Sequence, residues 1–194
     1  MKKIILSLAI ATVSIATVHA HNEGELKVNS KVSKVEWIGK KVSGQHEGTI
    51  AIKEGTIHLH DGKIDKGTIT IDMASIAVTD MEGEWAEKLK GHLESPDFFN
   101  VVEHSTAVFE ITKVTPGKEG SSHVVGNLTI KGITKPVEFD SKLEMKDGKL
   151  AAYAEVPVDR TLYDIKYGSG KFFEGLGDKM IDDIFTIKFK IAAE

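Results

Sequence analysis

Apolar and polar residues alternate with a period of two along most of this 194-residue chain. The clearest runs lie at 49–52, 56–60, 68–71 and 185–191. Because successive side chains of a β-strand point to opposite faces, this period places the apolar residues of each run on one face of a strand. Eight strands are predicted in all, at about 25–42, 45–60, 63–73, 104–115, 122–131, 134–146, 149–159 and 182–192.

Short turn sequences join the predicted strands. Asp61-Gly62, Pro116-Gly117 and Asp147-Gly148 each separate two runs, as is typical of tight connections between antiparallel neighbours. Many antiparallel strands connected in this way predict a two-sheet sandwich or a closed barrel. An eight-stranded barrel is large enough either to be filled by its own side chains or to hold one slender ligand. The alternation by itself leaves both kinds of interior open.

One segment breaks the period of two. Trp85, Leu89 and Leu93 are spaced four residues apart, which predicts an amphipathic helix at about 82–93 with a single apolar stripe. The Ser95-Pro96 pair ends it. We expect this inserted helix to cap one end of a barrel, with the following Phe98-Phe99 pair at the entrance.

The first twenty residues predict an export signal. Two lysines are followed by a short apolar run and by small residues at Val18 and Ala20, so we predict a signal peptide at 1–20 and one domain at 21–194. The apolar run is shorter than the ~20 residues that a membrane-spanning helix needs, and no later stretch approaches that length. We therefore expect no membrane span.

Charge and cysteine content exclude several classes of site. The chain carries 25 basic and 29 acidic residues, and two of the basic ones lie in the signal peptide, so the mature net charge is −6. An acidic chain of this kind argues against a nucleic-acid partner. There is no cysteine, which excludes disulfides, thiolate metal sites and thiol nucleophiles.

The remaining polar residues do not assemble a predicted catalytic site. A metal site would have to combine histidines with carboxylates, and His58 and His60 share a strand face that is expected to be exposed. The neighbouring Asp182 and Asp183 point to opposite faces of a strand and form a poor acid–base pair. We predict no metal ligands and no catalytic residues.

Arg160 is the single arginine of the chain. Its planar guanidinium can hold a carboxylate or phosphate with two hydrogen bonds, which lysine cannot do. Two roles are open. Arg160 can form an internal ion pair, for example with Asp159, Asp164 or an acid near Asp182, or it can contact the polar head of a ligand at the barrel mouth.

Several sequence blocks carry a family resemblance. They are HLESPDFF at 92–99, VGNLTIKGITKPV at 125–137 and VDRT at 158–161, in this order and spacing. The mature chain resembles the YceI-like family of bacterial periplasmic proteins over nearly its whole length. The resemblance implies an all-β fold, an eight-stranded antiparallel lipocalin-like barrel. It also implies a periplasmic protein that is not an enzyme, holds a long polyisoprenoid such as a quinone or a prenyl phosphate, and often forms a homodimer.

With the resemblance, the inward-facing apolar residues become candidates for the wall of a dry, elongated cavity. The chain is predicted to need no cofactor other than this bound isoprenoid lipid or quinone. Two alternatives are a metal-binding protein or enzyme that uses the histidines, and a stress-associated structural module with a filled barrel. The predicted ligand-binding residues of the interior and mouth are Trp37, Ile50, Ile52, Ile69, Ile71, Trp85, Leu89, Phe98, Phe99, Phe109, Leu128, Ile130, Phe139, Val158, Arg160, Phe185 and Ile187.

Overall fold

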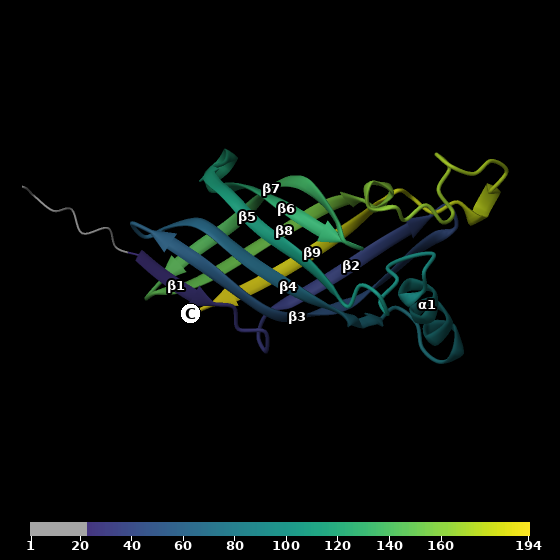
Figure 1. Cartoon of the computed structure of the whole chain (residues 1–194), viewed down its shortest axis with the longest axis horizontal. Helices are drawn as coiled ribbons and strands as arrows, with labels where there is room; N and C mark the ends of the chain where they lie inside the picture. Colours follow the sequence, from purple (N-terminus) through teal and green to yellow (C-terminus); the bar gives the residue numbers. More distant parts are fainter. Residues whose placement is uncertain (1–22) are drawn as a thin grey trace, which may run out of the picture.

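Nine β-strands and one α-helix follow one another in residues 23–194, the part of the chain that the computed structural model describes (Figure 1). The predicted signal peptide lies outside the described residues. The elements are β1 (Glu23–Lys27), β2 (Lys34–Lys41), β3 (Gly44–His60), β4 (Lys63–Val78), α1 (Glu84–Glu94), β5 (Thr106–Pro116), β6 (Ser122–Ile130), β7 (Ile133–Lys146), β8 (Lys149–Asp159) and β9 (Ile184–Ala193).

The strands close into an antiparallel barrel. Hydrogen-bonded neighbours run in the order β3, β2, β9, β8, β7, β6, β5, β4, and β4 pairs again with β3 to complete the ring. β1 pairs with the far part of β3, from Glu23 opposite His60 to Lys27 opposite Thr56, so it continues the line of β2. β1 and β2 thus share one position, and the predicted eight-stranded barrel is confirmed.

The predicted first strand at 25–42 is wrong in one respect, because a turn divides it. The carbonyl of Asn29 accepts hydrogen bonds from the backbone N–H groups of Val32 (3.3 Å) and Ser33 (3.0 Å). The side-chain oxygen of Asn29 also accepts one from the N–H of Lys31 at 3.2 Å. Asparagine side chains offer the backbone such local partners, which replace the ladder bonds of a strand.

Burial follows the alternation along the strands. In β8 the side chains of Leu150, Ala154, Val156 and Val158 are buried, and the positions between them are mostly exposed. β3 departs from strict alternation because its pairing with β4 is irregular between Thr49 and Ala51 and again between Ile52 and Glu54. Such bulges bend a strand and change which residues face inward. Because burial alternates along most strands, apolar residues from all around the ring meet inside the barrel.

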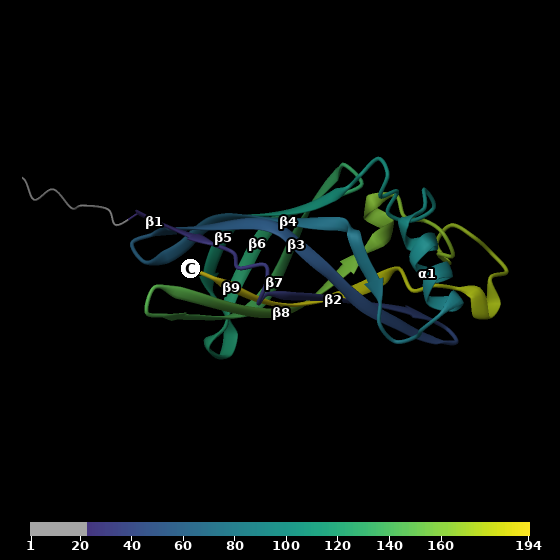
Figure 2. The ribbon, with the colours of Figure 1, turned by 90° about the horizontal axis from the view of Figure 1, so that it is seen from below.

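The helix and the longest connection lie at the same end of the barrel (Figures 1 and 2). α1 packs on the end of β4, and the loop at 160–183 joins β8 to β9 beside it. The Lys88 ammonium pairs with Glu84 at 2.7 Å along the outer side of the helix. Among residues 23–194, no helix has the length and apolar content needed to cross a membrane.

Gly48 is a point where the barrel tolerates no side chain. A Cβ atom there would lie 1.8 Å from the carbonyl oxygen of Ala77 and 2.7 Å from the Trp37 ring. We expect Gly48→Ala to lower the free energy of unfolding by about 1–3 kcal/mol, as overpacking does, measured by urea denaturation. Gly39 on β2 has open space around its Cα, so Gly39→Ala is the matched control and should change stability by less than about 0.5 kcal/mol. Equal effects of the two substitutions would contradict this account of Gly48.

Candidate functional site

A cavity of about 690 Å³ runs inside the barrel. At one end its wall is made of buried residues such as Ile57, Val124 and Leu150. At the end where α1 lies, exposed residues line it, so the cavity opens to solvent there. These exposed lining residues are Lys40, Lys41, Ser43, Tyr167, Asp178, Lys179 and Asp182.

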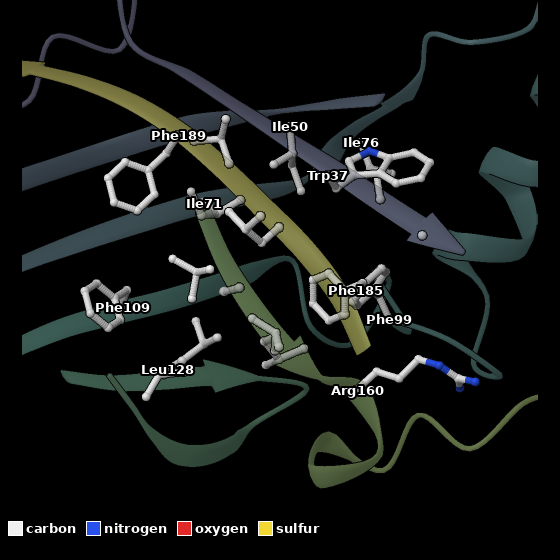
Figure 3. A pocket seen from close by; sticks show the side chains of 18 of the residues that line it. Trp37, Ile50, Ile71, Ile76, Phe99, Phe109, Leu128, Arg160, Phe185 and Phe189 are labelled. Carbon is white, nitrogen blue, oxygen red and sulfur yellow. The ribbon is translucent and has the colours of Figure 1, made fainter. Parts of the chain in front are cut away.

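The wall between these two ends is apolar. Phe109, Phe139 and Phe189 form a chain of ring contacts, with centroids 5.6 Å apart for the first pair and 5.8 Å for the second. Phe109, Leu128 and Phe189 lie around a common open space (Figure 3). All four side chains are half-buried although they face the barrel interior, so their exposed surface belongs to the cavity. The barrel is not filled by its own side chains.

The deep part of the cavity contains little polarity. Among the described residues, Ser141 is the polar side chain that lines the cavity at a distance from its mouth. The Ser141 hydroxyl donates a hydrogen bond to the carbonyl oxygen of Tyr153 at 3.0 Å. Nearer the mouth, the indole N–H of Trp37 donates to the carbonyl oxygen of Ala77 at 3.1 Å. With these groups already bonded, the inner wall offers a guest mainly apolar contact.

Fifteen of the seventeen predicted ligand-binding residues line this cavity. Their contact with a ligand stays a prediction. The fifteen are Trp37, Ile50, Ile69, Ile71, Leu89, Phe98, Phe99, Phe109, Leu128, Ile130, Phe139, Val158, Arg160, Phe185 and Ile187.

The structure places the other two predicted residues elsewhere. Trp85 is 72% exposed and does not line the cavity, because only the C-terminal part of α1 packs inward, through Leu93 and the half-buried Leu89. Ile52 is buried but also lies off the cavity wall. It sits between the first two irregularities in the pairing of β3 with β4, where it pairs with Ile71.

Sequence reasoning missed several lining residues. Ile57 and Leu150 belong to alternating runs, so the period of two could have found them. Tyr167 and Ile181 lie in the long connection between β8 and β9, whose sequence has no periodic pattern to indicate which side chains point inward. His92 comes three residues after Leu89 and so lies on the same face of the helix, from which its inward position could have been predicted.

Aromatic rings surround the mouth. The ring of His92 contacts Phe98 and Tyr167 edge-on, with centroids 5.0 and 4.4 Å away. The ring centroids of Phe98 and Phe99 lie 6.0 Å apart, and the ring of Phe99 contacts that of Phe185 edge-on, with centroids 6.4 Å apart. The predicted entrance role of the phenylalanine pair fits this placement, because both side chains line the cavity beside α1.

Arg160 is 3% exposed, and its guanidinium is held by backbone carbonyls. Its Nε donates to the oxygen of Asp182 (3.0 Å), its Nη1 to Ile165 (2.8 Å) and its Nη2 to Ile181 (3.0 Å). Asp183 supplies a carboxylate 3.7 Å from Nη2. Three segments of the connection between β8 and β9 are thereby tied together, which favours the internal role predicted for Arg160. A contact with a ligand head stays a prediction.

Asp159 and Lys171 extend this network toward the surface. Partial burial on its own raises the pKa of Asp159, but hydrogen bonds from Thr161 and from the Lys171 ammonium outweigh it, so the pKa is lowered overall. The ammonium of Lys171 lies 3.0 Å from Asp159 and 3.3 Å from Asp183. Because the folded pKa of Asp159 is lowered, its ionised form stabilises the fold at neutral pH, and this stabilisation is lost as pH falls through the lowered pKa.

Phe98 and Phe99 are expected to differ when each is replaced by alanine. Phe98 is 8% exposed and packs on His92, Tyr167 and Arg160, so Phe98→Ala should lower the free energy of unfolding by about 3–4 kcal/mol. Phe99 is half-buried and its free surface faces the cavity, so Phe99→Ala should cost less stability and weaken apolar binding about tenfold. Denaturation and titration with a hydrophobic fluorescent probe measure the two effects. Equal stability losses with unchanged probe affinity would show that both are ordinary core residues.

Histidines and carboxylates of residues 23–194 form no group of three that could hold a metal ion. The histidine pair on β3 is partly exposed to solvent and lies beside carboxylates of β1. His58 lies 3.7 Å from Glu25, and His60 lies 2.7 Å from Glu23.

Two UPF0312 proteins are similar to part of the chain. That of Ectopseudomonas mendocina (strain ymp) is 37% identical over 92 residues, which are 45% of this chain and 48% of the relative. That of Serratia proteamaculans (strain 568) is 45% identical over 83 residues, 43% of this chain and 40% of the relative. The aligned part of the chain thus spans less than half the length of these curated relatives.

Solved structures share the fold. Burkholderia cenocepacia BcnA superposes with a TM-score of 0.67 at 21% identity, covering 86% of this chain and 99% of BcnA. A polyisoprenoid binding domain from Saccharophagus degradans, implicated in plant cell wall breakdown, gives a TM-score of 0.66 at 12% identity and covers 87% of this chain and 97% of that domain. The sequence profile of the YceI-like domain matches residues 10–193. With that match over nearly its whole length, the chain belongs to the YceI-like family.

Proposed function

We propose that this protein is exported to the periplasm and holds one long polyisoprenoid-type lipid, a quinone or a prenyl phosphate, inside its barrel. The lipid would be transported, stored or sequestered, with no bond made or broken. The observation that carries the proposal is the apolar cavity of about 690 Å³, lined by exposed residues at the end where α1 lies and by buried residues such as Ile57 and Leu150 at the other.

The shape and polarity of the cavity suit such a ligand. Its volume lies within the ~300–1,000 Å³ of typical ligand sites. An isoprenoid tail that enters it leaves water, and each buried methylene contributes about 0.8 kcal/mol. A polar head buried without partners would cost several kcal/mol. The head therefore stays at the mouth, where His92, Lys40 and Lys179 line the opening.

The comparisons support this proposal. The Saccharophagus degradans domain, which shares the fold, is a polyisoprenoid binding domain. Membership of the YceI-like family agrees with a binding protein rather than an enzyme. The predicted signal peptide at 1–20 supports export, which N-terminal sequencing of the mature protein from a periplasmic fraction would test.

The binding proposal is tested by titrating protein stripped of lipid with detergent-dispersed isoprenoids. Trp37 lines the cavity and Trp85 does not, so a Trp85→Phe variant reports on the cavity through its remaining tryptophan. We expect saturable quenching by a long-chain quinone, and displacement of that quinone by a prenyl phosphate if both heads are accepted. A folded protein that shows no saturable response to either lipid would refute the proposal.

A further inference from the structure

Exposed apolar side chains gather on the loop at 160–183, next to the open end of the cavity. Phe172 and Phe173 are 48% and 50% exposed, although they are adjacent and large. Tyr167 of the same loop is 46% exposed and also lines the cavity, so this loop contributes both to the cavity wall and to the exposed apolar surface. Figures 1 and 2 show the loop extending beyond the strands at the end where α1 lies.

The fold holds the two phenylalanines in their exposed position. Ser169 is fully buried, and its carbonyl accepts hydrogen bonds from the N–H groups of Phe172 (3.1 Å) and Phe173 (3.0 Å). Its hydroxyl oxygen accepts another from the N–H of Lys171 at 3.2 Å. Arg160 fixes the start of the same loop through the carbonyl of Ile165. A braced turn that exposes two aromatic rings to water is typical of an interaction surface.

Three lysines line the cavity mouth at the same end of the barrel. Lys40, Lys41 and Lys179 line the mouth and are exposed, and none of them forms an ion pair within the part of the chain that the structure describes. The acids that line the mouth beside them are Asp178 and Asp182. The rim thus has more lysine than acid, while the whole chain has a net charge of −4.

We propose that this end of the barrel docks on a lipid bilayer that contains anionic phospholipids. Phe172 and Phe173 insert between the headgroups, and Lys40, Lys41 and Lys179 face the lipid phosphates. Aromatic side chains favour the membrane interface, and each lysine near an anionic surface adds attraction. Trp85, which is exposed on α1 at the same end, is a further interfacial side chain.

The proposal rests on the proposed function, because a polyisoprenoid is dissolved in a bilayer. If the mouth touches the bilayer, the tail passes into the cavity without crossing water. Exposure of the tail to water would cost free energy that rises with every exposed methylene. A second copy of the chain on the same surface would cover the opening through which the ligand must pass. The bilayer is therefore the occupant that keeps the cavity usable.

Flotation with vesicles tests the docking. Protein stripped of lipid is mixed with vesicles of phosphatidylcholine and phosphatidylglycerol, or of phosphatidylcholine alone, without any isoprenoid. We expect Phe172→Ser/Phe173→Ser to weaken binding to both kinds of vesicle about tenfold. Replacing Lys40, Lys41 and Lys179 by glutamine should weaken binding about tenfold or more to the anionic vesicles only.

Matched controls lie at the other end of the barrel. Met145 on β7 is 43% exposed, and Lys142 and Lys146 are exposed lysines of the same strand. Met145→Ser and the double variant Lys142→Gln/Lys146→Gln should bind vesicles like the unchanged protein. Circular dichroism and melting temperature confirm that every variant is folded, which the exposure of these positions favours.

The outcomes separate the two proposals. Binding of dispersed isoprenoid without binding to any vesicle overturns the docking and leaves the proposed function standing. Vesicle binding that responds to the mouth substitutions but not to the controls supports the docking even if no isoprenoid binds, in which case the proposed function fails. A dimer in light scattering that Phe172→Ser/Phe173→Ser dissociates, without vesicle binding, would assign the surface to self-association and overturn the docking.

Discussion

Ala152→Trp is expected to lower the affinity for a long polyisoprenoid about 100-fold while the barrel still folds. Ala152 lies on β8 between its partners Leu143 and Ile191, and all three line the deep part of the cavity. An indole placed there occupies space that the end of the tail would fill. Each methylene kept out of the cavity forfeits about 0.8 kcal/mol, so losing three or four of them accounts for the effect. Titration of the stripped protein with isoprenoids of different length measures it.

The neighbouring residue provides the control. Ala151 is exposed on the outer face of the same strand and does not line the cavity, so Ala151→Trp should leave affinity unchanged. A short isoprenoid, which does not reach the closed end, should bind Ala152→Trp almost normally. Equal loss for short and long chains, or no loss for either, would contradict a tail that runs the length of the barrel.

Arg160→Lys is expected to lower the free energy of unfolding by about 3 kcal/mol. The guanidinium donates to three carbonyls, those of Ile165, Ile181 and Asp182, and a single ammonium cannot reach all three. Each charged hydrogen bond is worth about 1.5–3 kcal/mol, and a buried carbonyl left unpaired adds to the loss. Urea denaturation of the variant and of the unchanged protein measures the difference.

The same variant separates the two roles of Arg160. If the side chain only braces the loop at 160–183, ligand affinity per folded molecule stays unchanged at a temperature where the variant is folded. If it also holds a ligand head, the ligand affinity per folded molecule falls about tenfold, as expected for the loss of one charged hydrogen bond. Unchanged stability with lost affinity would refute the internal role that the carbonyl contacts indicate.

The strands could be predicted from their alternation, and the closed eight-stranded barrel from the resemblance to the YceI-like family. Alternation along β8 and β9 places every second side chain inside, while antiparallel neighbours with short turns are compatible with a sandwich as well as a closed ring. The break between β1 and β2 could not be predicted from alternation. It depends on Asn29, whose hydrogen bonds compete locally with the ladder.

The site residues that the sequence missed or misplaced also depend on local contacts that a periodic pattern does not show. A helical stripe shows which face of α1 is apolar, but not how far the helix extends past the barrel. Trp85 belongs to that stripe, yet its side chain is exposed. Tyr167 belongs to a loop with no periodic pattern, and its position depends on packing against His92 and Phe98. The partners of Arg160 are backbone carbonyls, which residue types do not reveal.

The central claim is that the cavity carries an isoprenoid lipid in the cell. The most direct measurement is a mass spectrum of the organic-solvent extract of protein purified from its own host, with a metal analysis of the same sample. The account predicts a prenyl lipid in roughly stoichiometric amount and no transition metal, with the lipid reduced in the Ala152→Trp variant and retained in Ala151→Trp. A folded protein whose extract contains no prenyl lipid, or contains the same lipid in equal amount in both variants, would contradict it.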